Sequence, residues 1–104
     1  MDGIELISFQ IISSVGTARS HYIEAIQMAK AGKFVEAEKC MEEGEKTFLE
    51  GHHAHTELVQ KEANGDKTEF ALLLMHAEDI LMSAEAFSIL SREFIDVYRK
   101  IAGI

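Results

Sequence analysis

Residues 70–101 read FALLLMHAEDILMSAEAFSILSREFIDVYRKI, a stretch that contains neither proline nor glycine. Apolar side chains recur in it at alternating spacings of three and four residues, which is the pattern of an amphipathic helix rather than of a strand. The recurring positions are Phe70, Leu73, Ala77, Ile80, Ala84, Phe87, Ser91, Phe94, Tyr98 and Ile101. The stretch predicts a long helix over about residues 67–102, with Asp66 and Glu69 as a capping pair at its beginning.

Two further helices are predicted on the N-terminal side of this stretch. Glycine-containing turns, Ala31-Gly32-Lys33 and Ala63-Asn64-Gly65-Asp66, bound segments at about residues 4–31 and 34–63. Both segments repeat the three-and-four spacing, at Ile4, Ile7, Ile11, Val15, Ala18, Tyr22, Ile26 and Ala29, and at Ala37, Met41, Gly44, Phe48, Gly51, His55 and Leu58. The two glycines in the second set predict close backbone packing or a weaker helix. Asp2 and Glu5 predict a capping box for the first helix.

The composition of the whole chain fits one small helical domain. The 104 residues carry a formal net charge of −8 and no proline, and 47% of them are hydrophobic, which is enough for a core. Short turns between long helices make neighbouring helices antiparallel. We therefore expect residues 1–104 to form a single all-α domain, an antiparallel up-down-up three-helix bundle.

The charge and the apolar pattern also exclude several classes of partner. A strongly acidic chain lacks the basic surface that binding to nucleic acid or to an anionic membrane requires. No apolar run approaches the length of a membrane span, and the acidic N-terminus lacks the basic region of a signal peptide. We expect a cytoplasmic protein that does not insert into the membrane. Cys40 is the only cysteine, which rules out an internal disulfide and a cysteine-based zinc site.

The predicted third helix carries a second row of residues at helical spacing. This row consists of Leu72, His76, Asp79, Ser83, Ala86 and Leu90, and Leu74, Leu81 and Met82 add further apolar surface. A helix with this much apolar surface in so short a chain indicates self-association through third helices. Asp79 on such a seam is costly unless it pairs or binds a cation. Symmetric association would bring several copies of Asp79 together, which predicts a site for a hard cation.

His76 and Asp79 lie three residues apart, on the same face of the predicted helix. A neutral imidazole is a competent nucleophile, and a nearby carboxylate can orient its ring. The same spacing also suits a purely structural hydrogen bond, so the spacing alone does not choose between the two interpretations. The other histidines, His21, His52, His53 and His55, accompany no metal-ligand motif, and we expect them at the surface or at an interface.

Residues 72–84, LLLMHAEDILMSA, closely resemble the active-site helix of a known protein family. It is the lactose/cellobiose-specific enzyme IIA family of the bacterial phosphoenolpyruvate-dependent sugar phosphotransferase system, in which this helix reads approximately L-L-L-V-H-A-Q/E-D-x-L-M-T-A. Four further segments are similar to that family in the same order: GTARS at 16–20, AKAGKF at 29–34, TELVQKEA at 56–63 and FIDVY at 94–98. The resemblance covers essentially the whole chain.

The resemblance implies a phosphocarrier, a component of a phosphotransferase. In the family, the histidine that corresponds to His76 accepts a phosphoryl group from phospho-HPr and passes it to a cysteine of enzyme IIB. The transfer drives uptake and phosphorylation of a β-linked disaccharide such as lactose, cellobiose or chitobiose. The family forms homotrimers, and the aspartate that corresponds to Asp79 binds a metal, usually Mg²⁺, on the threefold axis.

Three positions depart from the family pattern. Glu78 stands where glutamine is common, Ile80 where a polar residue is common, and Lys33 where an aspartate usually caps the second helix. No Lys or Arg occurs between Thr68 and Ser91, so positive charge for a phosphoryl group on His76 is expected from the partner protein. Two other functions remain open at this point: a helical adaptor or regulator without phosphoryl transfer, and a purely structural oligomer.

Overall fold

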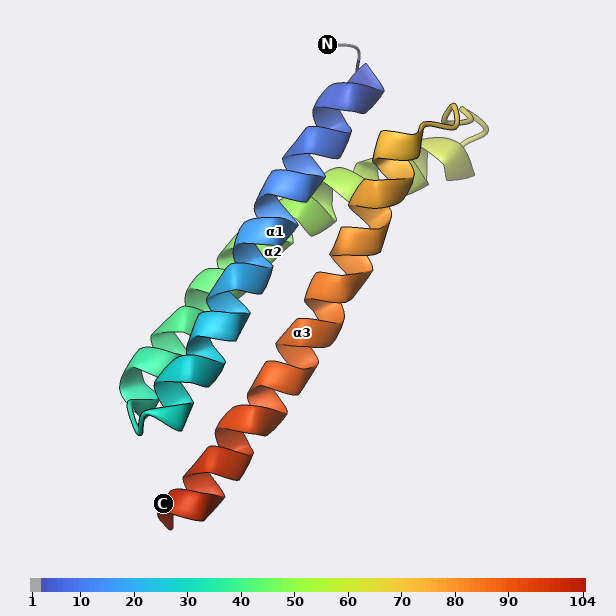
Figure 1. The fold of residues 1–104 in the computed structure, drawn as a ribbon. Coiled ribbons are helices and arrows are strands. Elements are labelled where there is room, and N and C mark those ends of the chain that lie inside the picture. The colour runs from blue at the N-terminus through green and yellow to red at the C-terminus, as the bar shows by residue number, and fades with distance from the viewer. Residues whose placement is uncertain (1–2) are drawn as a thin grey trace.

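The computed structural model describes residues 3–104, which form a bundle of three long helices. Helix α1 spans Gly3–Lys30, α2 spans Phe34–Ala63 and α3 spans Leu72–Ala102, and the described residues contain no strand. Figure 1 shows α1 and α2 as an antiparallel hairpin, with α3 running beside α1 in the same direction as α1. The bundle is elongated, with extents of 53 × 24 × 19 Å. The all-α, up-down-up prediction is confirmed.

The two predicted turns lie where glycine permits them. Gly32 and Gly65 adopt φ angles of +81° and +91°, in the left-handed region that side chains with a Cβ disfavour. After α1, the backbone N–H of Lys33 donates to the carbonyl of Met28 at 2.8 Å, which closes the helix end. Lys33 then begins α2 without a side-chain capping bond, as expected from a residue that lacks an acceptor at this position.

Helix α3 begins at Leu72, later than the residue 67 predicted from the apolar spacing. Its N-cap residue, Ala71, is extended, with φ −146° and ψ 133°, and provides no side-chain capping bond. The predicted capping pair of Asp66 and Glu69 is therefore wrong. The backbone N–H of Asp66 donates to the carbonyl of Lys61 at 3.1 Å, so Asp66 belongs to the end of α2. The predicted box at the first helix includes Asp2, which lies outside the described residues.

Helix α1 supplies the centre of the core. Its buried residues are Ser8, Ile11, Val15, Ala18, Tyr22, Ala25 and Ala29, most of which belong to the predicted row. One apolar cluster joins the C-terminal half of α1 to α2 and to Ile95 of α3, and a second joins Ile11 and Val15 to Ala77, Leu81 and Ala84 of α3. Because both clusters contain α1, this helix holds α2 and α3 in one domain.

The buried face of α3 differs from the predicted row toward the C-terminal end of the helix. Phe94 is 46% exposed and Ile101 is 75% exposed, whereas Ile95 is fully buried. A strict seven-residue repeat rotates by about 20° per heptad around a straight α-helix, so the predicted positions leave the core over this length. Leu81, predicted as additional outer surface, lies in the core at 7% exposure. Phe70 precedes the helix and is 78% exposed.

Gly44 and Gly51 allow α1 and α2 to approach closely. A Cβ atom at Gly44 would lie 2.5 Å from Cε1 of Tyr22, and one at Gly51 would lie 2.6 Å from Cγ1 of Val15. Both glycines are buried within α2, which remains continuous through them. Of the two alternatives left open by the sequence, close backbone packing is therefore the one observed.

Tyr22 ties the three helices together. Its phenol donates to Oε1 of Glu45 in α2 at 3.2 Å, and Ser88 of α3 donates to the same oxygen at 3.0 Å. Ser91 of α3 donates to the backbone carbonyl of Tyr22 at 3.2 Å. Burial is the main reason that the pKa of Tyr22 is raised to about 12; the Ser88 hydroxyl acts in the lowering direction, and the Glu45 carboxylate raises the pKa further.

The contact at Gly44 predicts a cost for Gly44→Ala. The added methyl group would overlap the ring of Tyr22, which cannot move freely because it is buried and hydrogen-bonded. We expect the free energy of unfolding to fall by about 1–3 kcal/mol, measured by urea denaturation. Gly16→Ala is the matched control, since its Cβ meets nothing within 4 Å in the described chain, and it should be neutral or stabilising. Equal losses in both variants would contradict the packing argument.

The raised pKa of Tyr22 predicts a loss of stability in alkali. Its folded-state pKa of about 12 lies above the ordinary value of 10.0, so the neutral phenol stabilises the fold fully below pH 10.0. This contribution, on the order of 2 kcal/mol, disappears as the pH rises toward the folded pKa. Tyr22→Phe should lower stability at neutral pH by about 1 kcal/mol through loss of the hydrogen bond, and it should flatten the alkaline decline. Parallel curves for the two proteins above pH 10.0 would contradict this role.

Candidate functional site

His76 lies in the second turn of α3 with its side chain exposed. The next residue, Ala77, is fully buried and packs in the apolar cluster that contains Ile11 and Val15 of α1. Because successive helical residues point about 100° apart, burial of Ala77 fixes the direction in which His76 projects. Among residues 3–104 the imidazole has no hydrogen bond or ion pair, so both ring nitrogens are available to a partner.

Asp79 shares this exposed face with His76. The row predicted from the sequence, here called the outer stripe, comprises Leu72, His76, Asp79, Ser83, Ala86 and Leu90, and all its members except the half-buried Ser83 are exposed. No hydrogen bond joins His76 to Asp79 within the described chain, although their spacing would permit one. The hydrogen-bond interpretation of their spacing therefore has no support in a single chain.

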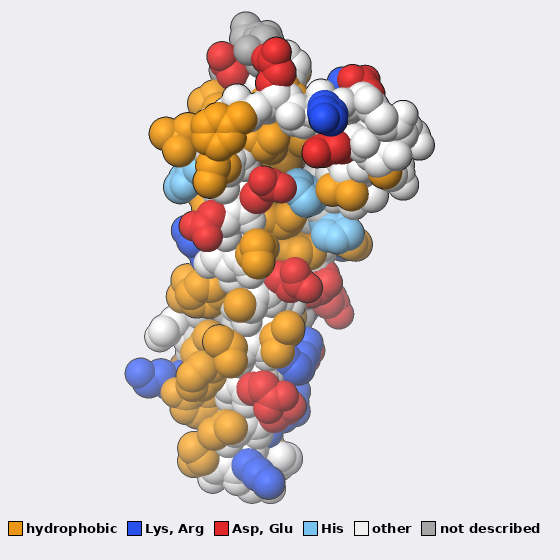
Figure 2. All heavy atoms as spheres, turned by 90° about the vertical axis from the view of Figure 1, so that its right-hand side faces the viewer, with side chains coloured by type: hydrophobic (Ala, Val, Ile, Leu, Met, Phe, Trp, Pro, Cys, Tyr) orange, Lys and Arg blue, Asp and Glu red, His pale blue; other side chains and the backbone are white. Residues whose placement is uncertain are grey.

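Apolar side chains dominate the surface of α3 around the outer stripe. Leu72 is 75% exposed, Met82 69% and Leu90 54%, and Val97 and Ile101 continue the apolar surface toward the C-terminus. Figure 2 shows hydrophobic side chains along much of the face on the α3 side of the bundle, interrupted by acidic groups. A lone small domain rarely exposes an apolar surface of this length, so this face has the character of an interface.

The surroundings of Asp79 decide whether a single chain could hold a metal ion there. Within the described range 3–104, no group of three or more His, Cys, Asp or Glu side chains converges as a metal site would require. The Asp79 carboxylate is nevertheless exposed and unpaired in that range, and carboxylate oxygen is the ligand type that Mg²⁺ prefers. The residue therefore fits a shared cation site whose remaining ligands come from other chains or from water.

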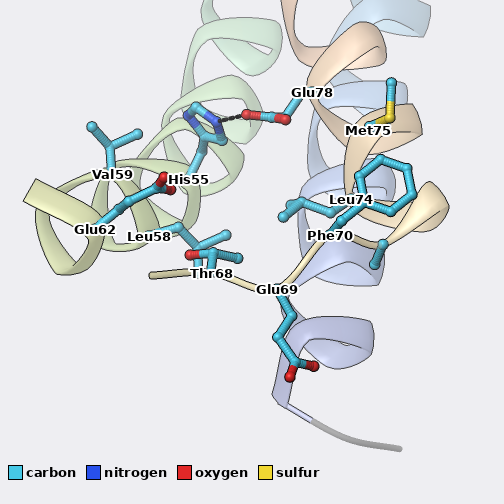
Figure 3. Close-up of a pocket in the computed structure, with 11 residues that line it drawn as sticks. His55, Leu58, Val59, Glu62, Thr68, Glu69, Phe70, Leu74, Met75 and Glu78 are labelled. Carbon is cyan, nitrogen blue, oxygen red and sulfur yellow. Dashed lines mark hydrogen bonds and ion pairs between the residues drawn. The ribbon is translucent and has the colours of Figure 1, made fainter. Parts of the chain in front are cut away.

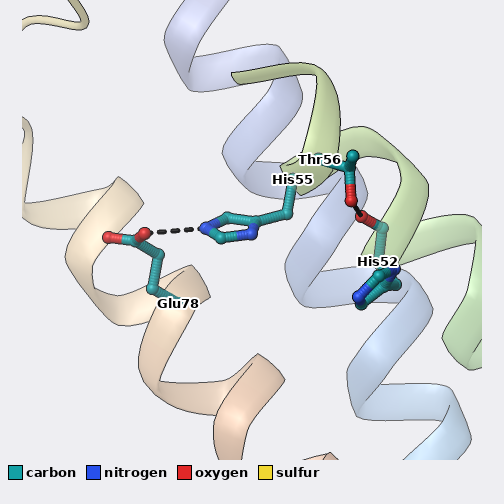
Figure 4. Close-up of polar contacts among 4 residues, drawn as sticks. All are labelled: His52, His55, Thr56 and Glu78. Carbon is teal, nitrogen blue, oxygen red and sulfur yellow. Dashed lines mark hydrogen bonds and ion pairs between the residues drawn. The ribbon is translucent and has the colours of Figure 1, made fainter. Parts of the chain in front are cut away.

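The structure adds a residue pair that the sequence analysis did not find. Nε2 of His55, in α2, lies 2.7 Å from Oε2 of Glu78, in α3, and the His55 side chain is only 22% exposed (Figure 4). His52 and His53 are exposed, as predicted for the histidine cluster, and His53 pairs with Glu57 of its own helix at 3.4 Å. His55 alone among these three reaches another helix.

A hollow of about 260 Å³ lies beside this pair, between the end of α2 and the beginning of α3. Figure 3 shows Leu58 and Val59 on the α2 side, Leu74 and Met75 on the α3 side, and the His55–Glu78 contact across the space. Glu62 of α2 and residues 68–71, which precede α3, complete the lining. Direct apolar packing between α2 and α3 is therefore interrupted at the level of the candidate site.

The basic side chains of α3 lie far along the helix from His76. Arg92 and Arg99 both contact Oε1 of Glu38, at 2.6 and 3.6 Å, near the opposite end of the bundle. The hydrogen bond from Arg92 is the main reason that the pKa of Glu38 lies below its ordinary value. These cations are thus committed to joining α2 and α3, and none of them accompanies the exposed imidazole.

Comparison with known proteins identifies the family. The profile of the family "PTS system, Lactose/Cellobiose specific IIA subunit" matches residues 6–99. The chain belongs to this family. It is a member of the sugar phosphotransferase system's IIA components, as the resemblance of residues 72–84 predicted. The lichenan-specific phosphotransferase enzyme IIA component of Bacillus subtilis (strain 168) is 44% identical over 98 residues, covering 94% of this chain and 89% of that protein.

Solved structures agree with this assignment. The cellobiose-specific enzyme IIA from Bacillus anthracis is 47% identical, with a TM-score of 0.96 over 99% of this chain and 94% of that one. A second similar structure is that of a IIA(Chitobiose)–HPr complex, with a TM-score of 0.86 and 27% identity over 98% of this chain and 99% of that one. The similarity extends over the whole bundle and includes α3.

No helix in the part of the chain that the structure describes combines the length and the hydrophobicity of a membrane-crossing segment. The exposed apolar residues of α3 are interspersed with His76, Asp79 and other polar groups.

Proposed function

We propose that this protein is a phosphocarrier that acts through His76. In this proposal the imidazole accepts a phosphoryl group from phospho-HPr and passes it to a cysteine of enzyme IIB. The observation that carries the proposal is the exposed, unpartnered imidazole of His76 on α3, in a chain of the lactose/cellobiose IIA family. The similar IIA(Chitobiose)–HPr complex supports HPr as the donor.

The proposed transfer depends mainly on positioning. A neutral ring nitrogen of His76 attacks phosphorus, the bond from phosphorus to the donor breaks, and a new phosphorus–nitrogen bond forms. In the second half of the relay, the thiolate of enzyme IIB attacks and the imidazole leaves. Such reactions have loose transition states, so in-line alignment and charge stabilisation contribute most of the catalysis. Packing of Ala77 against α1 supplies part of that alignment by fixing the backbone beside His76.

The lack of free basic side chains near His76 suits a protein that passes a phosphoryl group on rather than one that retains it. Thr68–Ser91 contains no Lys or Arg, and the arginines of α3 are bound to Glu38. We infer that stabilising cations arrive with the donor and leave with it. The net charge of −8 favours encounter with partners whose docking surfaces are basic.

We further propose that the protein works as a homotrimer in which the α3 helices pack around a threefold axis that Asp79 faces, while His76 stays accessible to partner proteins. The exposed apolar face of α3 supports self-association, because burial of Leu72, Leu90 and their neighbours would remove this surface from water. A threefold arrangement would place one Asp79 from each subunit at a common axis. Bound Mg²⁺ would supply positive charge there and relieve the repulsion among the three carboxylates.

The proposed cellular role follows from the relay. The protein would act in the cytoplasm and support uptake and phosphorylation of a β-linked disaccharide of the lactose, cellobiose and chitobiose class. Two relatives are described as specific for lichenan and for cellobiose, which both consist of β-linked glucose, and this supports a β-linked substrate. The exposed site on α3 has an apolar and acidic character that suits protein partners, so the sugar itself would be selected elsewhere in the system.

The first test of the proposal is transfer of labelled phosphate. Phospho-HPr should label the wild-type protein and His53→Ala, since His53 is an exposed histidine of α2 that pairs only with Glu57. His76→Ala should accept no label, because the nucleophile is gone. A labelled His76→Ala protein would sink the assignment, and an unlabelled wild type would favour the adaptor or the structural oligomer.

The second test addresses Asp79. Asp79→Leu should lose bound divalent metal, measured by elemental analysis, while sedimentation still gives the mass of a trimer, because leucine replaces repelling carboxylates with apolar contact. Asp96→Leu, a change at another exposed aspartate of α3 outside the outer stripe, should keep the metal. Metal retained in Asp79→Leu would overturn the proposed ligand, and a monomeric wild type would overturn the trimer.

A further inference from the structure

Glu78 brings a carboxylate to within two residues of the proposed nucleophile, and His55 binds it from the neighbouring helix. Two residues correspond to about 200° of rotation around an α-helix, so Glu78 and His76 project from nearly opposite sides of α3. Figure 4 shows the Glu78 side chain directed across the gap toward His55 of α2. The contact at 2.7 Å joins the turn of α3 that carries His76 to α2.

The beginning of α3 has few other attachments on this side. The helix has no side-chain N-cap bond, and Phe70 and Leu72 at its start are 78% and 75% exposed. The hollow of about 260 Å³ separates the apolar side chains of α2 from those of α3. Ala77 and Leu81 attach the helix to α1. In these first turns of α3, attachment to α1 alone restrains the orientation of the helix less than it is restrained farther along, and a contact with α2 adds a second restraint.

The other polar contacts between α2 and α3 lie farther along the bundle. Ser88 donates to Glu45 near the middle, and Arg92 and Arg99 contact Glu38 toward the far end. Among the described residues, His55–Glu78 is therefore the polar link between these helices at the level of His76. We propose that His55 is a positioning residue: by holding Glu78, it fixes the orientation of the α3 turn that presents His76 for phosphoryl transfer.

The chemistry of the contact defines which substitutions preserve it. A carboxylate at Glu78 only accepts hydrogen bonds, and it is matched by the His55 tautomer whose proton is on Nε2. A glutamine at position 55 places an amide N–H close to where Nε2 lies, whereas an asparagine is shorter and leaves the gap to Glu78 unspanned. A glutamine at position 78 still offers an acceptor oxygen, whereas an alanine offers none. His55→Gln and Glu78→Gln should therefore retain the contact, whereas His55→Asn and Glu78→Ala should lose it.

This inference rests on the proposed role of His76. The rate of phosphoryl transfer from phospho-HPr tests it. His55→Asn and Glu78→Ala should each lower kcat by about three- to tenfold, because small displacements of a reacting group are costly in an in-line transfer. Their KM for phospho-HPr should stay within about twofold, since the docking surface is intact. His55→Gln and Glu78→Gln should recover most of kcat. The double variant His55→Asn/Glu78→Ala should be no slower than either single variant.

Arg92→Ala is the matched control for general weakening of the α2–α3 contact. It removes the short bond to Glu38 at the far end of the bundle and should leave kcat within about twofold of the wild type. Thermal unfolding of all variants, followed by circular dichroism, establishes that the rates belong to folded protein. Should Glu78→Ala fail to fold, the comparison of His55→Asn with His55→Gln decides the question alone.

Several outcomes would overturn the positioning role. They are an unchanged kcat in His55→Asn, equal slowing in His55→Asn and His55→Gln, multiplied losses in the double variant, and equal slowing in Arg92→Ala. A wild type that takes no label, or a His76→Ala protein that does, would instead refute the phosphocarrier function. A labelled wild type with an unaffected His55→Asn would refute only the role of His55.

Discussion

The close approach of α1 and α2 is the constraint on which the rest of the bundle depends. Tyr22 packs on the backbone at Gly44, and Val15 packs on the backbone at Gly51. Seven residues back along α1 thus correspond to seven residues forward along α2, as antiparallel helices of equal rise require. Once this register is set, Tyr22 presents its phenol to Glu45 and its carbonyl to Ser91, and α3 gains its position from both.

The sequence contains most of this architecture. Gly32 and Gly65 mark the turns. The apolar spacing identifies the buried faces of α1 and α2, because a helix that is buried along one side carries apolar residues at helical spacing on that side. The beginning of α3 was harder to predict, since residues 67–71 continue a helical pattern while their backbone is needed to span from α2 to α3. The C-terminal part of the buried face of α3 differs from the predicted row, because a heptad repeat drifts around the surface of a straight α-helix.

The candidate site, like the fold, is predictable from the sequence only in part. His76 and Asp79 could be found because the motif around them is compact, and the structure places both on one exposed face. The pairing of His55 with Glu78 cannot be predicted from spacing rules, because these rules describe neighbours within one helix. Its signal lies in the register: His55–Glu78 and Glu45–Ser88 differ by ten residues in α2 and by ten in the opposite direction in α3. Carried outward from the predicted helix ends at residues 63 and 67, an antiparallel register places His55 opposite Met75, which is about one helical turn from Glu78.

The turn at Ala31–Lys33 has a consequence for how the chain reaches its fold. Because this turn is short, the contacts between α1 and α2 join residues that are close in sequence, and closing such a loop costs little chain entropy. Helix α3 instead follows the connecting residues 64–71 and packs on α1, from which the whole of α2 separates it in the sequence. We therefore expect the α1–α2 hairpin to form first during folding, with α3 docking onto the groove that the hairpin presents. The helix that carries His76 would then be the last to join, and the surface it displays would come into existence only when the fold is complete.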